Sequence, residues 1–216
     1  MHLKTLGITL ASVGLIGGSL LPAVAMADPI NPPAAAPDNG QPDPARDGQW
    51  QYPFDNFDPN VNISSPFGMR DLYGQAQFHD GIDIDTDTNN DQDIKAIHGG
   101  TVYKIDHEGM TQNDLGYYIC VKSDDGYYEI YQEFAFTPEE AAQAIKVHVG
   151  QHIHPGDTVA HLVQTDHVNH VHIGVTKTEA MEAQKSWETD DGTWLNPIQL
   201  IQDFQNQQAQ QQNNPA

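Results

Sequence analysis

Two pairs of residues have the types and spacing to hold a metal ion. His79 and Asp83 lie four positions apart around Gly81, and His170 and His172 are separated by one residue. In a straight strand the Cα atoms of the first pair would be about 13 Å apart, so the chain must bend, and glycine permits a bend. In the second pair, a strand would point both imidazoles to one face, about 6.6 Å apart. One imidazole could then bind the ion while the other faces a substrate.

Spacing alone does not identify the site. The chain has 11 histidines and 30 acidic residues among its 216 residues. At that content, chance gives roughly one His-x3-Asp pair and roughly half a His-x-His pair. His152 and His154 form a second His-x-His pair. The choice between the two pairs therefore requires the surrounding sequence.

The segments around His79 and His170 form an ordered set of motifs. In chain order they are Ser64-Ser65-Pro66-Phe67-Gly68-Met69-Arg70, His79-x-Gly81-Ile82-Asp83, residues 94–102, residues 149–159, His170-Val171-His172 and Asn196-Pro197. This set resembles the M23 family of zinc endopeptidases, the lysostaphin and LytM group, which cut peptidoglycan cross-bridges. The resemblance extends over about residues 62–200. The ordered combination is far more specific than any single motif.

The resemblance implies a zinc metalloendopeptidase that hydrolyses peptide bonds in peptidoglycan. It assigns one Zn²⁺ per domain to His79, Asp83 and His172, which leaves a fourth position for water, as in catalytic zinc sites. Such an ion lowers the pKa of water and polarises the peptide carbonyl. The first histidine of the His-x-His motif, here His170, would position water and stabilise the transition state.

One position departs from the family pattern. A second catalytic histidine is usual in a Tyr-x-His-Leu strand, but residues 131–134 read Tyr-Gln-Glu-Phe. In an active enzyme, Glu133 is the general base, a role that carboxylates fill beside zinc in other metalloproteases. The alternative is a catalytically lapsed, zinc-binding module that binds cell wall or regulates another wall hydrolase. His167, three residues before His170, is a candidate groove residue that could supply the missing imidazole.

The remaining polar clusters are expected on the surface. The other histidines are predicted to be surface residues rather than a second metal site: His98, His107, His148, His152, His154 and His161. Residues 85–93 alternate acidic and amide side chains like a calcium loop. However, Asn90 and Ala96 occupy the positions where an EF-hand has Gly and Glu, so a solvated acidic loop is expected.

The hydrophobic pattern predicts mostly strands. Alternating β-branched and aromatic residues predict strands at residues 101–105, 117–121, 127–134, 158–163 and 170–176. Helices are expected at residues 137–146, which begin with a Thr N-cap followed by Pro, at residues 178–187 and from about residue 197 to 204. Together with the resemblance, this predicts a mostly β protein with a compact antiparallel β-sheet core, an open groove and short peripheral helices.

The composition along the chain predicts four segments. A short apolar run and an Ala-Met-Ala site predict a signal peptide at residues 1–27. Repeated prolines predict a linker at 28–49. The M23-like domain is expected at 50–202, and Gln and Asn predict a disordered tail at 203–216.

Charge and cysteine content limit the partners and location. A net charge of −21 argues against binding to nucleic acid or to an anionic membrane surface. A single cysteine excludes an intramolecular disulfide. We therefore expect a secreted protein, extracellular or in the cell wall. It would be a monomer that contacts peptidoglycan peptides but neither nucleic acid nor, after signal cleavage, membrane.

Overall fold

The computed structural model describes residues 40–109 and 114–213 of the chain. The predicted signal peptide, and the predicted linker up to residue 39, lie outside these residues. Within the described part, no helix has both the length and the apolar character needed to cross a membrane.

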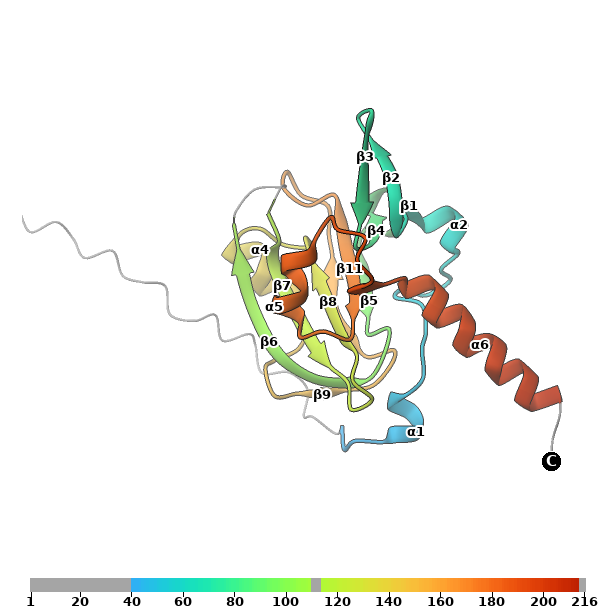
Figure 1. The fold of residues 1–216 in the computed structure, drawn as a ribbon. Helices are drawn as coiled ribbons and strands as arrows, with labels where there is room; N and C mark the ends of the chain where they lie inside the picture. Colours follow the sequence, from blue (N-terminus) through green and yellow to red (C-terminus); the bar gives the residue numbers. More distant parts are fainter. Residues whose placement is uncertain (1–39, 110–113, 214–216) are drawn as a thin grey trace, which may run out of the picture.

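An antiparallel sheet of eight strands forms the centre of the molecule (Figure 1). Seven strands follow the order β1-β4-β11-β8-β7-β6-β9, and β12 pairs with β11. In that order their bounds are β1 Ile63–Ser65, β4 Gly81–Asp85, β11 His170–Thr176, β8 Tyr128–Gln132, β7 Gly116–Lys122, β6 Gly100–Glu108, β9 His152–Ile153 and β12 Trp194–Leu195. The predicted mostly β fold is confirmed, and the prediction for residues 170–176 coincides with β11.

Two smaller antiparallel pairs flank the main sheet. Strands β5 (Gln92–Lys95) and β10 (Thr158–Leu162) form one pair, and β2 (Gly68–Leu72) and β3 (Gln75–His79) form the other. The β2–β3 hairpin turns at Tyr73 and Gly74, whose φ angles of 54° and 83° are the left-handed values that tight two-residue hairpin turns require. The hairpin projects from the main sheet in Figure 1, and its far strand delivers His79 to the site.

Helices lie at the periphery, as predicted, and those in the described part are short except for the last one. They are α1 Pro44–Asp47, α2 Pro59–Asn62, α3 Thr86–Asn89, α4 Pro138–Ala144, α5 Ala180–Ala183, followed by the 3₁₀ turn η1 Gln184–Ser186, and α6 Pro197–Asn213. Helix α4 begins with a complete capping box, in which the Thr137 hydroxyl accepts from the Glu140 N–H and the Glu140 carboxylate accepts from the Thr137 N–H.

Both ends of the described chain are more ordered than the composition predicts. Helix α6 continues to Asn213, through most of the segment expected to be a disordered tail. At the other end, α1 lies within the predicted linker, and Asp47 in it is buried. A proline-rich composition does not reveal this short helix, because its buried Asp47 contacts His152, which is distant in sequence.

Side chains along β4 and β11 point alternately to the two faces of the sheet, and this alternation determines which of them reach the groove. Ile82, Ile84, Val171 and Ile173 are fully buried in the main core cluster. Successive side chains of a strand point to opposite faces, so Asp83 and the two histidines of β11 point away from that core. A slip of one residue would exchange these two sets, and the cost of burying charged groups therefore stabilises this register.

Candidate metal centre

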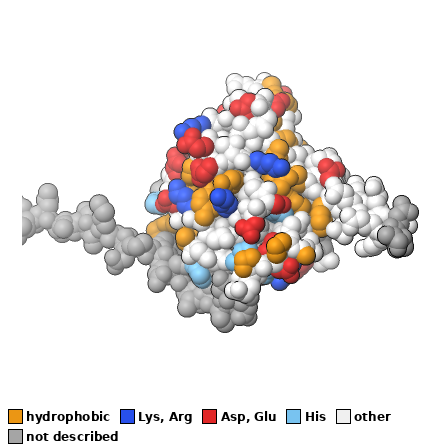
Figure 2. Space-filling model, turned by 60° about the horizontal axis from the view of Figure 1, so that its bottom comes forward, with side chains coloured by type: hydrophobic (Ala, Val, Ile, Leu, Met, Phe, Trp, Pro, Cys, Tyr) orange, Lys and Arg blue, Asp and Glu red, His pale blue; other side chains and the backbone are white. Residues whose placement is uncertain are grey.

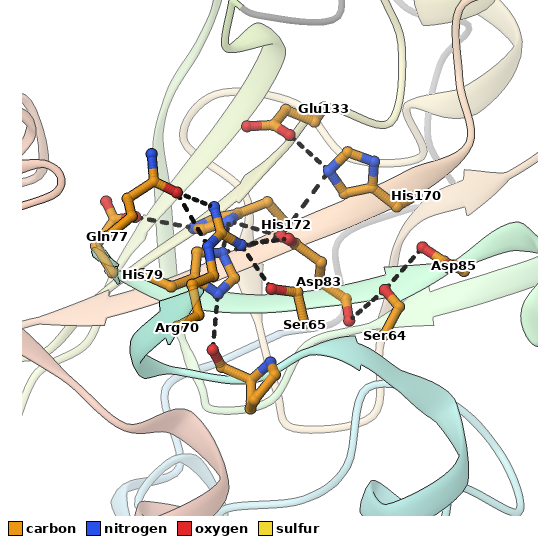
Figure 3. A network of polar contacts seen from close by, with 12 residues as sticks. Ser64, Ser65, Arg70, Gln77, His79, Asp83, Asp85, Glu133, His170 and His172 are labelled. Atoms are coloured by element: carbon orange, nitrogen blue, oxygen red, sulfur yellow. Dashed lines mark hydrogen bonds and ion pairs between the residues drawn. The ribbon is translucent and has the colours of Figure 1, made fainter. Parts of the chain in front are cut away.

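Strand register brings the three predicted zinc ligands together. His172 on β11 lies directly opposite Asp83 on β4. The chain bends at Asp80, between β3 and β4, so His79 at the end of β3 turns back toward Asp83. The predicted bend within this motif is thus present, one residue before Gly81. Figure 3 shows the three side chains converging from these strands.

The distances within this triad fit a zinc ion. His79 Nε2 lies 3.1 Å from Asp83 Oδ1 and 3.1 Å from His172 Nδ1, and the last two atoms are 2.9 Å apart. Ligands at the usual 2.0–2.1 Å from a tetrahedral Zn²⁺ are separated by about 3.3 Å, so the three atoms already span the face that the ion would occupy. Two imidazole nitrogens and one carboxylate oxygen are also the donor set of catalytic zinc sites.

Neighbouring backbone atoms orient the two imidazoles. His79 Nδ1 donates to the Pro66 carbonyl over 2.9 Å, which leaves the lone pair of Nε2 facing the triad. A Cβ added at Gly81 would lie 2.4 Å from His172 Nε2 and 2.4 Å from the Ile173 carbonyl oxygen. Only glycine therefore leaves room for the ring of His172 at this position.

Arg70 holds the carboxylate of Asp83 from the other side. Its Nη1 lies 3.3 Å from Asp83 Oδ2 and donates to Ser65 Oγ over 2.5 Å. The same guanidinium donates to Gln77 Oε1 from Nε and Nη2, at 3.1 and 2.8 Å. Arg70 occurs in the first family motif, but its spacing from the ligands gave no sign of this contact. Because Arg70 contacts Oδ2 of Asp83, the other oxygen, Oδ1, remains directed at the two imidazoles.

The electrostatics of the triad favour an ionised carboxylate. Burial alone would raise the pKa of Asp83, but the adjacent imidazoles of His172 and His79 hold that pKa well below its usual range. Burial likewise opposes charge on His172, whereas the hydrogen bond to Asp83 and the nearby carboxylates of Asp80 and Glu133 raise its pKa to about 9. The metal-free triad thus holds a proton that a divalent cation would displace.

His170 and Glu133 form an ion pair beside the triad (Figure 3). His170 Nε2 lies 2.6 Å from Glu133 Oε2 and 3.8 Å from Asp83 Oδ1. Its Nδ1 lies 2.7 Å from Asn169 Oδ1, so both ring nitrogens face an acceptor, which fits the imidazolium form. Burial lowers the pKa of His170, but the Glu133 hydrogen bond and the charges of Asp83 and Glu133 give a net rise.

Glu133 reaches this pair from an unusual backbone conformation. It follows β8 directly and has a φ of 67°, which is uncommon for a residue other than glycine. This conformation ends the strand earlier than the predicted 127–134 segment. The Glu133 N–H donates to the Leu115 carbonyl over 3.0 Å, and Gln132 Nε2 donates to Glu133 Oε1 over 3.2 Å. The strained position therefore holds the carboxylate toward the triad.

A cleft adjoins the triad, as the predicted groove requires. Its walls include Arg70, Phe78, Asp80, Glu133, Gln132 and Trp187. Trp187 is 57% exposed, so an aromatic surface is open to a bound chain at one side of the cleft.

His167 does not join this group. It is exposed on the loop before β11, and its Nδ1 lies 3.2 Å from Glu140 Oε1 at the start of α4. The structure therefore does not place its imidazole beside the triad, where the missing family histidine would be.

Three histidines predicted on the surface are buried: His98, His152 and His154. His98 stacks on Trp50 with ring centroids 4.1 Å apart and contacts Gln49 and Asp125. The predictions of a surface position for these three residues are wrong. Each ring is buried beside a carboxylate that is distant in sequence, and this contact compensates for its burial. His107 is exposed, and His148 and His161 are half-buried.

The acidic stretch at residues 85–93 does not converge on one point. Asp85 accepts a hydrogen bond from Ser64 over 2.7 Å, whereas Asp91 and Asp93 contact the two ring nitrogens of His161. The stretch is also divided between β4, α3 and β5. The carboxylate oxygens of Asp85, Asp91 and Asp93 therefore contact different neighbours and do not surround a common point.

Comparisons with known proteins show the family to which the chain belongs. Residues 77–185 match the family described as Peptidase family M23. The crystal structure of CbpA from L. salivarius REN is similar, with 29% identity, a TM-score of 0.58, and coverage of 74% of this chain and 98% of that chain. The catalytic domain of lysostaphin from Staphylococcus simulans is 17% identical with a TM-score of 0.43, covering 66% and 90% of the two chains. A search of curated proteins gave no match. The matched segment is half of the chain, and the chain belongs to peptidase family M23.

Proposed function

We propose that this protein is a secreted zinc metalloendopeptidase that hydrolyses peptide bonds in peptidoglycan. The observation that carries the proposal is the convergence of three ligand atoms, separated by 2.9–3.1 Å, beside the His170–Glu133 pair. Membership of the M23 family supports the reaction class.

Three residues would hold the ion, and the ion would supply Lewis acidity. His79 Nε2, His172 Nδ1 and Asp83 Oδ1 are the ligands that the geometry supports. Zn²⁺ at such a site makes water a nucleophile near neutral pH and polarises the scissile carbonyl. Arg70 and the Pro66 carbonyl fix the orientation of Asp83 and His79, so little rearrangement is needed when the ion binds.

Glu133 is the proposed general base. Its carboxylate takes a proton from the attacking water and returns it to the leaving amine nitrogen when the C–N bond breaks. A carboxylate oxygen accepts more than one hydrogen bond, so the contact with His170 does not prevent this transfer. General bases of this kind contribute about 10²–10⁴ to the rate.

His170 is the proposed donor to the negative charge that develops on the carbonyl oxygen. Glu133 and Asp83 stabilise its imidazolium form, and Asn169 fixes the plane of its ring. A fixed cationic donor stabilises a transition-state oxyanion more than it stabilises the neutral carbonyl of the substrate. This division gives the base role and the donor role to different residues.

Turnover on purified cell wall tests the proposal. The zinc-loaded full chain is incubated with peptidoglycan, and the released muropeptides are identified by mass spectrometry. We expect new peptide termini that a chelator prevents from forming. Wall binding without any new terminus would instead support the lapsed module that binds wall or regulates another hydrolase.

We also propose a location and partners. The apolar N-terminal run with a small-residue cleavage site supports secretion, and a net charge of −21 opposes contact with nucleic acid. We propose that the mature chain acts as a monomer on peptidoglycan peptides. Gel filtration with light scattering tests the monomeric state.

A further inference from the structure

A second cluster of metal-ligating side chains lies at the other end of the main sheet. His152 is on the edge strand β9, whereas His172 is on β11, four strands away in the order β11-β8-β7-β6-β9. Neighbouring strands are about 4.8 Å apart, so the separation along the sheet is about 19 Å. The second cluster therefore cannot share an ion with the triad.

This cluster consists of Asp47, His152 and His154. Their exposed fractions are 5%, 8% and 8%, so all three are buried. His152 Nε2 lies 2.9 Å from Asp47 Oδ2, and His154 Nδ1 lies 2.5 Å from Asp47 Oδ1. One ligand atom from each residue lies within 4.8 Å of the others. Two ligands on one Zn²⁺ are at most about 4.2 Å apart, so small side-chain movements suffice for all three to bind.

Local structure brings these side chains together from distant segments. Ile153 is fully buried in the core, and the alternation of the strand places the histidines before and after it on the opposite face. Asp47 ends α1, and its carbonyl accepts from the N–H of Gly99 over 3.1 Å. A Cβ at Gly99 would lie 2.8 Å from Asp47 Oδ1, so glycine is needed for this close approach.

The charge of the cluster fits a cation. The carboxylate of Asp47 is buried, and its ion-pair partners among the described residues are the two imidazoles, with no Lys or Arg. A buried carboxylate flanked by two imidazoles is a donor set that borderline divalent metals favour.

We infer that Asp47, His152 and His154 form a second zinc site, which fastens residues 43–50 to the edge of the sheet. Binding would replace the hydrogen bonds between the imidazoles and Asp47 with metal bonds, which requires that each ligating nitrogen present its lone pair in place of a proton. The inference is independent of the proposed peptidase activity, because no residue of the cluster lies in the catalytic cleft. The competing reading is a hydrogen-bonded clasp without metal.

Zinc stoichiometry in the full chain distinguishes the two readings. Each purified variant is saturated with Zn²⁺, passed through a desalting column and analysed for bound metal. We expect two zinc ions in the wild type, one in His172→Ala, one in His154→Asn and none in the double variant. Asparagine at position 154 keeps a donor for Asp47, so the fold is retained while a metal ligand is lost. His107→Ala, at an exposed histidine outside both clusters, should keep two.

Thermal unfolding of His172→Ala gives a second readout. Added Zn²⁺ should raise its melting temperature, because the remaining site is occupied in the folded state. Zn²⁺ should have no such effect on the double variant His172→Ala/His154→Asn. A folded His172→Ala that binds no zinc, and whose melting temperature does not respond to Zn²⁺, would overturn the second site and establish the clasp.

Discussion

His170 and His172 point to the same face of β11 but have different neighbours. His172 Nδ1 contacts the side chains of Asp83 and His79, whereas His170 Nε2 contacts Glu133 at 2.6 Å. In the proposed enzyme, the imidazole of His172 would therefore bind the ion, and that of His170 would act on the substrate. The spacing of the two residues predicted a shared face, but the division of roles rests on these contacts and on the family.

Replacing each histidine should separate the two roles. His172→Ala should lose one equivalent of zinc, because only two ligands remain at the triad. His170→Ala should keep that zinc and lose about 10²-fold or more in hydrolysis rate. Metal analysis of both variants, with wall hydrolysis measured in parallel, checks this. Equal loss of zinc from both variants would show that the roles are assigned wrongly.

The absence of a side chain at Gly81 leaves room for the ring of His172, so a larger residue there should disturb the triad. Gly81→Ala would place a Cβ 2.4 Å from His172 Nε2, so the ring or the backbone of β11 must move. We expect weaker zinc binding and a loss of about 1–3 kcal/mol in the free energy of unfolding. Urea titration and zinc competition measure these effects.

Gly126→Ala is the matched control for that variant. Nothing lies within 4 Å of a Cβ at Gly126, so its cost is limited to left-handed backbone strain, and zinc affinity should not change. Equal zinc affinity in Gly81→Ala and wild type would disprove the steric role of Gly81.

Helix α4 is anchored by its first turn. Glu140 accepts from the backbone N–H groups of Phe136 and Thr137, and its other oxygen accepts from Thr165 Oγ1 over 2.5 Å. Burial raises the pKa of Glu140, but these hydrogen bonds and that from His167 lower it overall to about 2. The helix is therefore tied to the loop before β11 by an ionised carboxylate.

This lowered pKa predicts a loss of stability in acid. The folded-state value lies below the unfolded value of about 4.5, so the contribution is complete above pH 4.5 and disappears as the pH falls through 2. Glu140→Gln should lose less stability than wild type between pH 5 and pH 2. Urea midpoints at several pH values measure this, with the exposed Glu139→Gln as control. If the urea midpoint of Glu140→Gln fell with pH as steeply as that of the wild type, the anchoring role of Glu140 would be contradicted.

Long elements were predictable from the sequence, and short ones were not. Residues 170–176 and 117–121 carry enough alternating or continuous apolar residues to predict β11 and β7. Strands β9 and β12 have two residues each, too few for a periodic signal. The β2–β3 hairpin was missed because its residues up to position 76 are mostly exposed and show no buried alternation.

The parts of the site that the sequence left open depend on long-range contacts. The triad ligands were identified by family motifs, and strand register explains how they meet. The contacts of Arg70 with Asp83 and of Asn169 with His170 were missed, because they depend on where the folded chain places these side chains and not on their spacing in the sequence. The Asp47 cluster was missed because its carboxylate is separated from His152 by 105 positions in the chain.

The chain as a whole is strongly acidic. Figure 2 shows Asp and Glu side chains spread over one face, interspersed with a few Lys and Arg side chains. With a net charge of −21, the chain should be repelled by walls that contain phosphate-rich polymers. Salt screens such repulsion, and the Debye length falls from about 30 Å at 0.01 M to about 8 Å at 0.15 M.

Wall binding should therefore increase with salt. Sedimentation of the chain with such walls should show severalfold more bound protein at 0.15 M than at 0.01 M NaCl. Walls stripped of the phosphate polymers should show a weaker dependence. Binding that decreases with salt would indicate a cationic docking surface and contradict this picture.

Glu133→Gln tests the proposed role of Glu133 as the general base. The amide is close in shape to the carboxylate but cannot accept the proton of water, so zinc content and fold should be retained. The rate of peptide-bond hydrolysis in purified wall, measured from muropeptides at equal zinc occupancy, should fall by about 10²–10⁴. Glu133→His, which restores the residue type usual in the family, should keep or raise the rate. Hydrolysis by Glu133→Gln at the wild-type rate would contradict the proposed role of Glu133. If Glu133→His cleaved the wall and the wild type did not, the wild-type domain would be a lapsed enzyme.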